Sequence, residues 1–466
     1  MTKPFKDEHL SEPPDIYTTD KQSINEDASP HFRGKRPNCK KLGQGFKRLR
    51  TLSALLGWEI SDICPGWGDT KPEHMNPNGL LALFHFLSNV SLMNSNKDSS
   101  AVHPQPLMKQ THNNGSIVFD YHKLQKQANL PTGFIWPNLE FAQEEHKEPL
   151  IDLQGFISGD ERATAEAIEH VRGACVNHGL FQVINHGVDA SLLKAASEEI
   201  DSIFKLPLER KLGIPRKTGL PQGYSGGHAE RFTKNLTWNE TFTFDYYEND
   251  AEPLVVDHFK SVLGQDFECS GWVYQKYCQA MWKLSGILFE LLAVCLGVDR
   301  KHYKKFFEDG YSIMRLNFYP PCNNSALTLG TSPHYDPSSI TILLQERVEG
   351  LEVFSNNKWQ TVRPRPDALV IIIGDTFMAL SNGIYKSCLH RAVVNGERER
   401  RSLAFFVTPK ADKVVRPPQD LICREGTRLY PDFTWSQLLG FTQKHHRVDA
   451  ATFPSFVNWL SSSKNL

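Results

Sequence analysis

The sequence predicts a mixed α/β protein with a mainly β core, a double-sheet jelly roll flanked by helices. Between residues 312 and 409, apolar residues alternate with a period of two in seven short β-branched runs separated by Pro, Asn or Gly turns. Upstream of these runs, apolar residues recur every three or four positions, as in amphipathic helices. Polar residues within the runs are spaced to converge on one interior, which favours a jelly roll over an immunoglobulin-like sandwich.

The 466-residue chain divides into four predicted regions. Residues 1–100, rich in Pro, Asn, Ser, Lys and Asp, are predicted to be a disordered extension, and their basic stretch at 35–50 is interpreted as solvated charge rather than a nucleic-acid signal. Residues 101–300 are expected to form a region of helices and strands, 301–415 the jelly-roll domain and 416–466 a helical closure.

The N-terminal helices and strands of the folded part follow from local patterns. Residues 149–153 predict a short strand and the apolar spacing after Asp160 predicts a helix. Residues 179–188 alternate like a strand, and an apolar stripe over 192–204 predicts a second helix. The longest helix is expected over 272–296, with Gly297 as its stop. These helices are expected to form a layer that supports the sheet.

The seven alternating runs are the predicted strands of the jelly roll. Asn356 and Asn357 are expected to form a hairpin turn between two of them. Two further helices are expected around 434–441 and 453–460. The seven runs are 312–319, 338–345, 350–354, 358–362, 368–373, 387–394 and 402–408.

Charge and cysteine content limit the partners that the chain is expected to bind. Lys and Arg total 52 against 53 Asp and Glu, so neither a nucleic-acid nor an anionic-membrane footprint is expected, and a small-molecule substrate is the better hypothesis. The nine cysteines contain no C-x-x-C pair, which is typical of reduced thiols. The apolar run at 79–93 is too short to span a bilayer. These observations predict a cytoplasmic monomer.

A metal site is predicted from His334, Asp336 and His390. In a strand, residues two apart point to the same face, so His334 and Asp336 can aim a nitrogen and an oxygen at one ion. His390 lies in a later strand, far enough along for intervening strands to return it to His334. Two histidines and one carboxylate form the facial triad of non-haem Fe(II) oxygenases, although catalytic zinc uses a similar set.

Arg400 and Ser402 favour iron over zinc. They share a strand face, and their N–H and hydroxyl groups suit the distal carboxylate of 2-oxoglutarate, a di-acid whose 2-oxo acid end would bind iron. Taken singly, each histidine is more often a structural residue at a strand edge, and Arg400 belongs to a charged run that is more often solvated. The four residues together favour a metal and co-substrate site.

Several segments resemble the plant 2-oxoglutarate- and Fe(II)-dependent dioxygenases, and among them the gibberellin 20-oxidases. The resemblance spans residues 101–466 and is most specific in IGDTFMALSNGIYKSCLHRAVVN at 373 and RRSLAFFVTPKADKVV at 400, with LTLGTSPHYDPSSITIL at 327 and NFYPPC at 317 in support. It implies a distorted double-stranded β-helix in which His334, Asp336 and His390 bind Fe(II). Arg400 and Ser402 would hold 2-oxoglutarate, with Asn317 and Tyr319 lining its pocket.

The resemblance also implies a reaction: stepwise oxidation and loss of carbon-20 of a C20 gibberellin to give a C19 gibberellin, using 2-oxoglutarate and O2, with ascorbate as a supporting reductant. A gibberellin 3- or 2-oxidase, another plant 2-oxoglutarate oxygenase and a catalytically silent binding module remain alternatives. A carboxylated hydrocarbon substrate calls for aromatic walls and a cation or donor. The residues expected to line that pocket are Trp238, Phe242, Phe244, Lys386 and Ser387.

Three residues depart from the family pattern. The segment LTWNET resembles a block usually written LPWKET, so Thr237 and Asn239 stand where Pro and Lys are usual. Because that block is associated with gibberellin binding, substrate preference is the property in question. Ile372 stands where Asn is usual and is expected to alter a hydrogen bond near the site.

Overall fold

The large sheet has eight strands in the order β1-β2-β10-β7-β12-β5-β4-β3 in this computed structural model. The structure describes residues 118–127, 129–215, 221–229, 235–248, 252–445 and 452–463, so the predictions for residues 1–100 lie outside the described residues. Only the β1–β2 pair is parallel. The strands are β1 (Leu150–Asp152), β2 (Leu180–Ile184), β3 (Gly223–Gly226), β4 (Glu240–Tyr246), β5 (Tyr311–Tyr319), β7 (Ile340–Gln345), β10 (Leu369–Ile373) and β12 (Arg400–Thr408).

A second sheet of four antiparallel strands has the order β6-β11-β8-β9. Asn356 and Asn357 have φ angles of 54° and 61° and connect β8 to β9, which confirms the predicted hairpin turn. A two-stranded sheet pairs β13 (Val414–Val415) with β14 (Phe433–Thr434). The strands of the second sheet are β6 (Leu329–His334), β8 (Leu351–Ser355), β9 (Lys358–Thr361) and β11 (His390–Val393).

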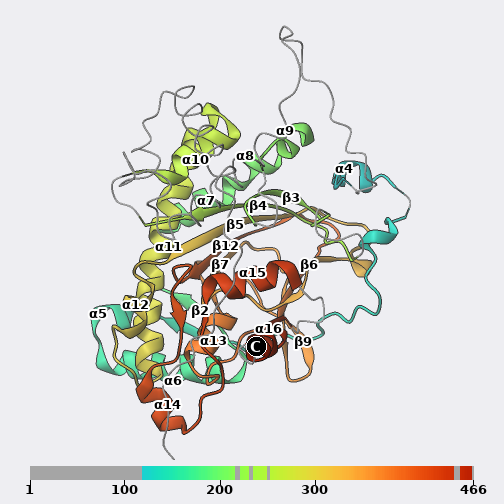
Figure 1. The fold of residues 1–466 in the computed structure, drawn as a ribbon. Helices are drawn as coiled ribbons and strands as arrows, with labels where there is room; N and C mark the ends of the chain where they lie inside the picture. Colours follow the sequence, from blue (N-terminus) through green and yellow to red (C-terminus); the bar gives the residue numbers. More distant parts are fainter. Residues whose placement is uncertain are drawn as a thin grey trace, which may run out of the picture. The chain divides into compact units, whose positions relative to one another are not determined.

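Both faces of the large sheet are buried, and alternation along β10 shows how. Ile371 and Ile373 belong to the hydrophobic cluster that the helices share with the sheet. Val370 and Ile372 point the other way and pack with Leu351 of the second sheet. In Figure 1 the helices α8 (Ile200–Phe204), α9 (Leu208–Leu212) and α10 (Leu254–Leu263) lie on one side of strands β3, β4 and β5, and β9 lies on the other. This layering confirms the predicted jelly roll flanked by helices.

The longest helix, α11, packs against the large sheet as a core helix. It starts at Glu268, slightly before the predicted residue 272, and ends at Cys295, where Gly297 follows with a φ of 66°. By length and composition alone this helix could cross a membrane, but its apolar residues, such as Met281 and Leu288, belong to the main core cluster. Among the described residues, the other helices of eight or more residues are α6 (Glu161–Asn177), α7 (Ala190–Glu198), α10 (Leu254–Leu263), α15 (Trp435–His445) and α16 (Thr452–Ser463).

All seven predicted jelly-roll strands are present, as are the strands at 150–152 and 180–184. The apolar stripe at 192–204 forms two helices, α7 and α8 (Ile200–Phe204), rather than one. Strands β3, β4 and β6 were not among the predicted runs, although Thr and Phe alternate along β4. Four strands of the large sheet, β1 to β4, come from the region upstream of residue 300, so that region helps to build the sheet itself.

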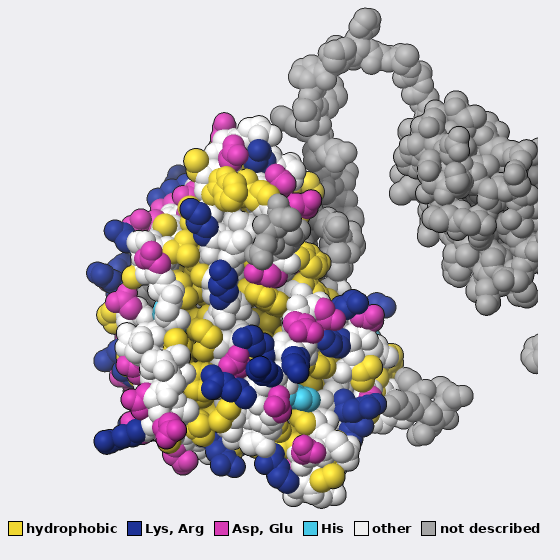
Figure 2. All heavy atoms as spheres, turned by 90° about the vertical axis from the view of Figure 1, so that its left-hand side faces the viewer, with side chains coloured by type: hydrophobic (Ala, Val, Ile, Leu, Met, Phe, Trp, Pro, Cys, Tyr) yellow, Lys and Arg dark blue, Asp and Glu magenta, His cyan; other side chains and the backbone are white. Residues whose placement is uncertain are grey.

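Basic and acidic side chains intermingle on the face shown in Figure 2, which includes the side of α11 and α12 (His302–Phe307). There Arg300 and Lys304 pair with Glu290 at 2.8 and 2.7 Å. Lys413 and Asp309 form a further ion pair at 2.5 Å. These five charged residues are therefore paired with close neighbours.

Candidate active site

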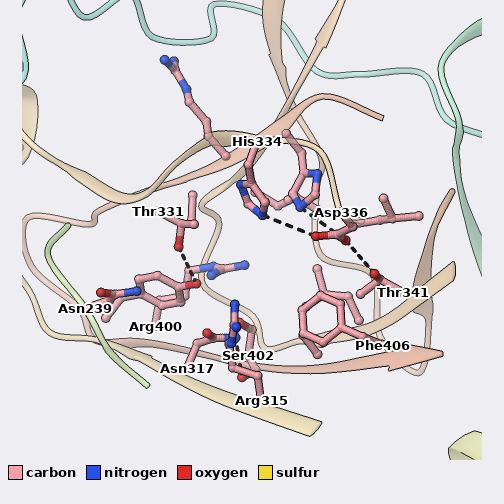
Figure 3. A pocket seen from close by; sticks show the side chains of 18 of the residues that line it. Asn239, Arg315, Asn317, Thr331, His334, Asp336, Thr341, Arg400, Ser402 and Phe406 are labelled. Carbon is pink, nitrogen blue, oxygen red and sulfur yellow. Dashed lines mark hydrogen bonds and ion pairs between the residues drawn. The ribbon is translucent and has the colours of Figure 1, made fainter. Parts of the chain in front are cut away.

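Three metal-binding side chains meet between the two sheets. His334 ends β6 and pairs in register with His390, the first residue of β11. One ligand atom from each of His334, Asp336 and His390 lies within 4.8 Å of the other two. Asp336 lies just beyond the end of β6, so the turn after the strand, rather than the strand pleat, directs its carboxylate toward the histidines. Figure 3 shows the side chains of His334 and Asp336 facing each other.

Backbone carbonyls orient both imidazoles. His334 Nδ1 donates to the Ser332 carbonyl at 2.8 Å, and His390 Nδ1 donates to the Cys388 carbonyl at 3.1 Å. With the proton on Nδ1, each Nε2 carries a lone pair. These Nε2 atoms lie 3.5 and 3.9 Å from the Asp336 carboxylate oxygens, so the three donors point into one space. This arrangement is the one that metal-binding histidines use.

The charge states of the triad suit a divalent cation. Burial alone would raise the pKa of the Asp336 carboxyl, but His390, His334 and the Thr341 hydroxyl outweigh burial and hold that pKa well below its usual range. Burial, with a contribution from His334, lowers the pKa of His390 to about 4. At neutral pH, Asp336 is therefore an anion and His390 a neutral donor.

Thr341, on β7, was not predicted as a site residue. Its Oγ1 donates a 2.6 Å hydrogen bond to Asp336 Oδ2, while Asp336 Oδ1 faces His334. The sequence carried no specific signal for this role, because a Thr at a strand start is common.

Arg400 presents a buried guanidinium to the pocket. It is 2% exposed, and its Nη2 donates to Gln345 Oε1 at 3.3 Å. Its Cζ lies 5.0 Å from the centre of the Tyr319 ring, and its Nε has no hydrogen-bond partner. Among the described residues, no carboxylate lies within ion-pair distance of Arg400. A buried cation without a counter-ion is costly, so this position calls for an anionic ligand.

Asn317, Tyr319 and Ser402 surround Arg400 as the resemblance implied. The register of β12 against β5 pairs Arg400 with Tyr319 and Ser402 with Asn317. Asn317 Nδ2 donates to Ser402 Oγ at 3.2 Å, and the Tyr319 hydroxyl lies 3.3 Å from Thr331 Oγ1. These groups form one polar wall that lines the same pocket as the triad.

The prediction that Trp238, Phe242 and Phe244 line the substrate pocket is wrong. Phe242 and Phe244 lie on the face of β4 that packs against the helices, with ring centres 5.7 and 5.3 Å from that of Phe259. Trp238 is 1% exposed, packs edge-on to Phe119 and Phe134, and donates from Nε1 to the Pro320 carbonyl. None of the three predicted aromatic residues lines the pocket.

Lys386 and Ser387 also lie outside the pocket lining, contrary to expectation. The Lys386 side chain is exposed, and its backbone N–H donates to the Cys175 carbonyl near the end of α6. A Cβ at Gly179 would lie 2.1 Å from the Lys386 carbonyl oxygen, so this loop packs closely against the start of β2. Burial raises the pKa of the Asp375 carboxyl to about 7. The Ser387 hydroxyl faces this carboxyl and opposes the rise.

The three departures from the family pattern all fall at or beside the pocket. Asn239 lines it and is 1% exposed. The Thr237 hydroxyl donates to Asn239 Oδ1 at 2.9 Å, while Asn239 Nδ2 is a buried donor without a hydrogen-bond partner. Ile372 also lines the pocket, as an apolar side chain. Arg315, His228 and Phe406 complete this wall and were not predicted.

The residues present fit Fe(II) and 2-oxoglutarate. Two oriented imidazoles and an ionised carboxylate form the facial donor set of non-haem iron, and the partnerless Nε of buried Arg400 marks the place for a carboxylate. Gly350 packs closely on Arg400, since a Cβ there would lie 2.7 Å from Arg400 Cδ. His334, Asp336 and His390 would therefore hold the metal, and Arg400 and Ser402 the far end of the di-acid.

Comparison with known proteins agrees with this arrangement. Residues 310–409 match the family model of the 2OG-Fe(II) oxygenase superfamily, and residues 149–261 match the model of the non-haem dioxygenase in morphine synthesis N-terminal region. The crystal structure of JOX2 in complex with 2OG, Fe and JA superposes with a TM-score of 0.63 at 31% identity, over 73% of this chain and 98% of that chain. The crystal structure of the dioxygenase for auxin oxidation in rice superposes with a TM-score of 0.54 at 26% identity, over 64% and 95%.

The fold and the site define a 2-oxoglutarate- and Fe(II)-dependent dioxygenase. The chain is 49% identical over 353 residues to gibberellin 20 oxidase 2 of Arabidopsis thaliana, covering 75% of this chain and 92% of the relative. It is 50% identical over 347 residues to gibberellin 20 oxidase 1-B of Triticum aestivum, covering 74% and 95%. The chain belongs to the gibberellin 20-oxidase family.

Proposed function

We propose that this enzyme oxidises carbon-20 of C20 gibberellins in successive steps and removes it, giving C19 gibberellins, with 2-oxoglutarate and O2 as co-substrates. The identity of about half of the aligned residues to gibberellin 20 oxidases, over more than nine-tenths of those relatives, supports the substrate class. Ascorbate is proposed as a supporting reductant. We thus assign to this chain the activity that the names of its relatives state.

The observation that carries the proposal is that the triad shares one pocket with a buried guanidinium that has no carboxylate partner among the described residues. The triad supplies a metal site, and Arg400 demands an anion at a fixed place beside it. A silent binding module would have no need of a desolvated cation opposite a metal site. Together these groups select a di-acid that reaches from the metal to Arg400.

The chain's own residues bind, orient and exclude water. When bound, ferrous iron and 2-oxoglutarate supply the activation of O2 and the oxidising equivalents. Ser332 and Cys388 carbonyls fix the direction of the two imidazoles, and Thr341 fixes that of the carboxylate. The inner residues of the large sheet, such as Leu343 and Ile372, form an apolar wall that keeps water away. The pocket needs no acid–base pair of its own.

The test is incubation of purified protein with Fe(II), ascorbate, 2-oxoglutarate and a C20 gibberellin, with the products identified by mass spectrometry. We expect a C19 gibberellin and succinate, because only a 20-oxidase removes a carbon. His334→Ala should abolish both products, since it removes a metal ligand. Products that are hydroxylated at carbon-3 or carbon-2 and keep carbon-20 unoxidised would reject carbon-20 removal and indicate a gibberellin 3- or 2-oxidase.

We further propose a cytoplasmic monomer. The seven cysteines among the described residues are all free thiols, which supports a reducing compartment. The locally paired surface charges of Figure 2 support a small-molecule enzyme without a nucleic-acid or membrane partner. Size-exclusion chromatography with light scattering tests the oligomeric state.

A further inference from the structure

Three arginines line the pocket, and two of them have an assigned role. Arg400 awaits the far carboxylate of 2-oxoglutarate. Arg391 is 3% exposed, pairs with Glu352 at 2.5 Å, and lies 4.0 Å from the centre of the Trp359 ring. Its charge is thus balanced within the protein, and it serves the structure of the second sheet. The third arginine of the pocket lining is Arg315.

Arg315 lies on the pocket side of β5. Its neighbours Met314 and Leu316 point into the helix-facing core, so Arg315 shares the opposite face with Asn317 and Tyr319. The register against β12 places Arg315 opposite Ala404, whereas Tyr319 is opposite Arg400. Four residues of strand separate the backbones of these two rows by about 13 Å. Arg315 and Arg400 therefore occupy different ends of one wall.

Contacts with Thr243 and Phe406 help to orient the Arg315 side chain. Its Nε donates to Thr243 Oγ1 at 3.3 Å, and its Cζ lies 5.3 Å from the centre of the Phe406 ring. Figure 3 shows Arg315 between Asn317 and Phe406, on the wall that faces His334 and Asp336. A guanidinium keeps its charge at all relevant pH values and matches the geometry of a carboxylate. The side chain is thus an oriented, half-buried cation on the wall of the pocket that the triad also lines.

The co-substrate accounts for two carboxylates, one at the metal and one at Arg400. A gibberellin brings a carboxylate of its own, and the residue first expected to bind it, Lys386, is outside the pocket. We propose that Arg315 binds the carboxylate of the substrate and so selects carboxylated hydrocarbon substrates and sets their orientation at the metal. This inference rests on the proposed function.

The first experiment measures substrate binding without turnover. Enzyme loaded with Fe(II) and 2-oxoglutarate under argon is titrated with a C20 gibberellin by calorimetry. Arg315→Gln should weaken binding roughly 10- to 100-fold, because it removes a charged hydrogen-bond donor opposite a carboxylate. Arg315→Lys keeps the charge without the fork and should lose less. Unchanged binding to Arg315→Gln would overturn the proposal.

A methyl ester of the gibberellin separates carboxylate recognition from general damage to the pocket. Wild type should bind the ester more weakly than the acid, whereas Arg315→Gln should bind both about equally. The two changes are then non-additive, as expected for partners in direct contact. If the variant loses the same factor for acid and ester, Arg315 does not contact the carboxylate and the proposal is wrong.

A third measurement tests whether Arg315 binds the carboxylate of the gibberellin or that of 2-oxoglutarate. Turnover of 2-oxoglutarate to succinate without gibberellin should show the same KM for 2-oxoglutarate in wild type and Arg315→Gln. A raised KM there would assign Arg315 to the co-substrate instead. Lys386→Ala is the matched control and should leave gibberellin binding unchanged. If wild type itself neither binds nor converts the gibberellin, the proposed function is wrong and so is the inference. If wild type binds the gibberellin and Arg315→Gln binds it equally well, only the role of Arg315 is wrong.

Discussion

At the scale of single residues, Thr341 ties the metal-binding carboxylate to β7. Thr341→Val removes the 2.6 Å hydrogen bond to Asp336 but keeps the side-chain shape. Because partners of metal ligands orient those ligands, we expect the affinity for Fe(II) to fall roughly 10- to 100-fold. Anaerobic titration of metal-free protein with Fe(II) measures the change. Thr341→Ser keeps the hydroxyl and should bind metal like wild type; equal losses in both variants would contradict this role.

The metal and co-substrate residues could be predicted from the sequence, but the substrate wall could not. His334, His390, Arg400 and Ser402 are polar residues within strands, and Asp336 follows one of these strands directly, so their spacing in the sequence carries information about where they meet. Phe242 and Phe244 lie in a strand whose residues are buried on both faces, and the two rings face the helices. Apolar residues on such a strand do not reveal which face looks into the pocket.

At the scale of elements, a buried ion pair joins helix α9 (Leu208–Leu212) to β4 directly beside Asn239. Lys211 Nζ lies 2.6 Å from Glu240 Oε1, and the Tyr224 hydroxyl donates to the same oxygen at 2.5 Å. Lys211 is 4% and Glu240 1% exposed. Burial raises the pKa of Glu240 while Lys211 and Tyr224 oppose that rise. The pair therefore fixes the edge of the large sheet that carries part of the pocket wall.

Removing one partner of this pair should be strongly destabilising. Lys211→Met leaves the Glu240 carboxylate buried without its cation, and we expect the free energy of unfolding to fall by about 3–5 kcal/mol. Urea denaturation followed by circular dichroism measures the loss. The double variant Lys211→Met with Glu240→Gln removes both charges and should recover part of it. A single variant as stable as wild type would show that the pair contributes nothing.

A second element-scale feature is the contact between the segment at 144–148 and the turn before β2. The His146 N–H donates to the Thr361 carbonyl of β9 at 2.9 Å, and the His146 ring centre lies 4.4 Å from that of His178. Burial lowers the pKa of His178 to about 4; His146 and Lys386 add to this effect, and Glu148 opposes it. His178 is therefore neutral in the folded protein near neutral pH.

This shift predicts a pH dependence of stability. A histidine in the unfolded chain titrates near pH 6.5, so between about pH 6.5 and 4 the unfolded state binds more protons at residue 178 than the folded state does. Stability should fall as the pH falls through this window. His178→Gln should reduce that fall relative to wild type, with the other histidines unchanged in both proteins. Thermal midpoints measured from pH 7 to 4.5 test this, and parallel curves would contradict it.

At the scale of the whole molecule, sequence patterns predicted the kind of architecture but not the membership of the large sheet. Strands β1 to β4 precede the jelly-roll runs and join the sheet through pairings between residues far apart in sequence, such as Thr241 with Asn317. Local periodicity reports a strand but not its partner, so such pairings could not be predicted. The jelly roll at 301–415 and the preceding region therefore share one sheet and both contribute to its two cores.

The last prediction concerns how much of the chain the enzyme needs. The site and the cores lie within the compact unit Gln110–Leu466, and the aligned gibberellin 20 oxidases match about three-quarters of the chain. A variant that starts at residue 110 should keep the wild-type thermal midpoint and the wild-type KM for 2-oxoglutarate. A matched variant that starts at residue 130 also loses Phe119 and Leu124, which pack on Phe134 and Trp238. Because it uncovers that cluster, it should unfold at a lower temperature. Loss of 2-oxoglutarate turnover in the variant that starts at residue 110 would show instead that residues 1–109 contribute to the active enzyme.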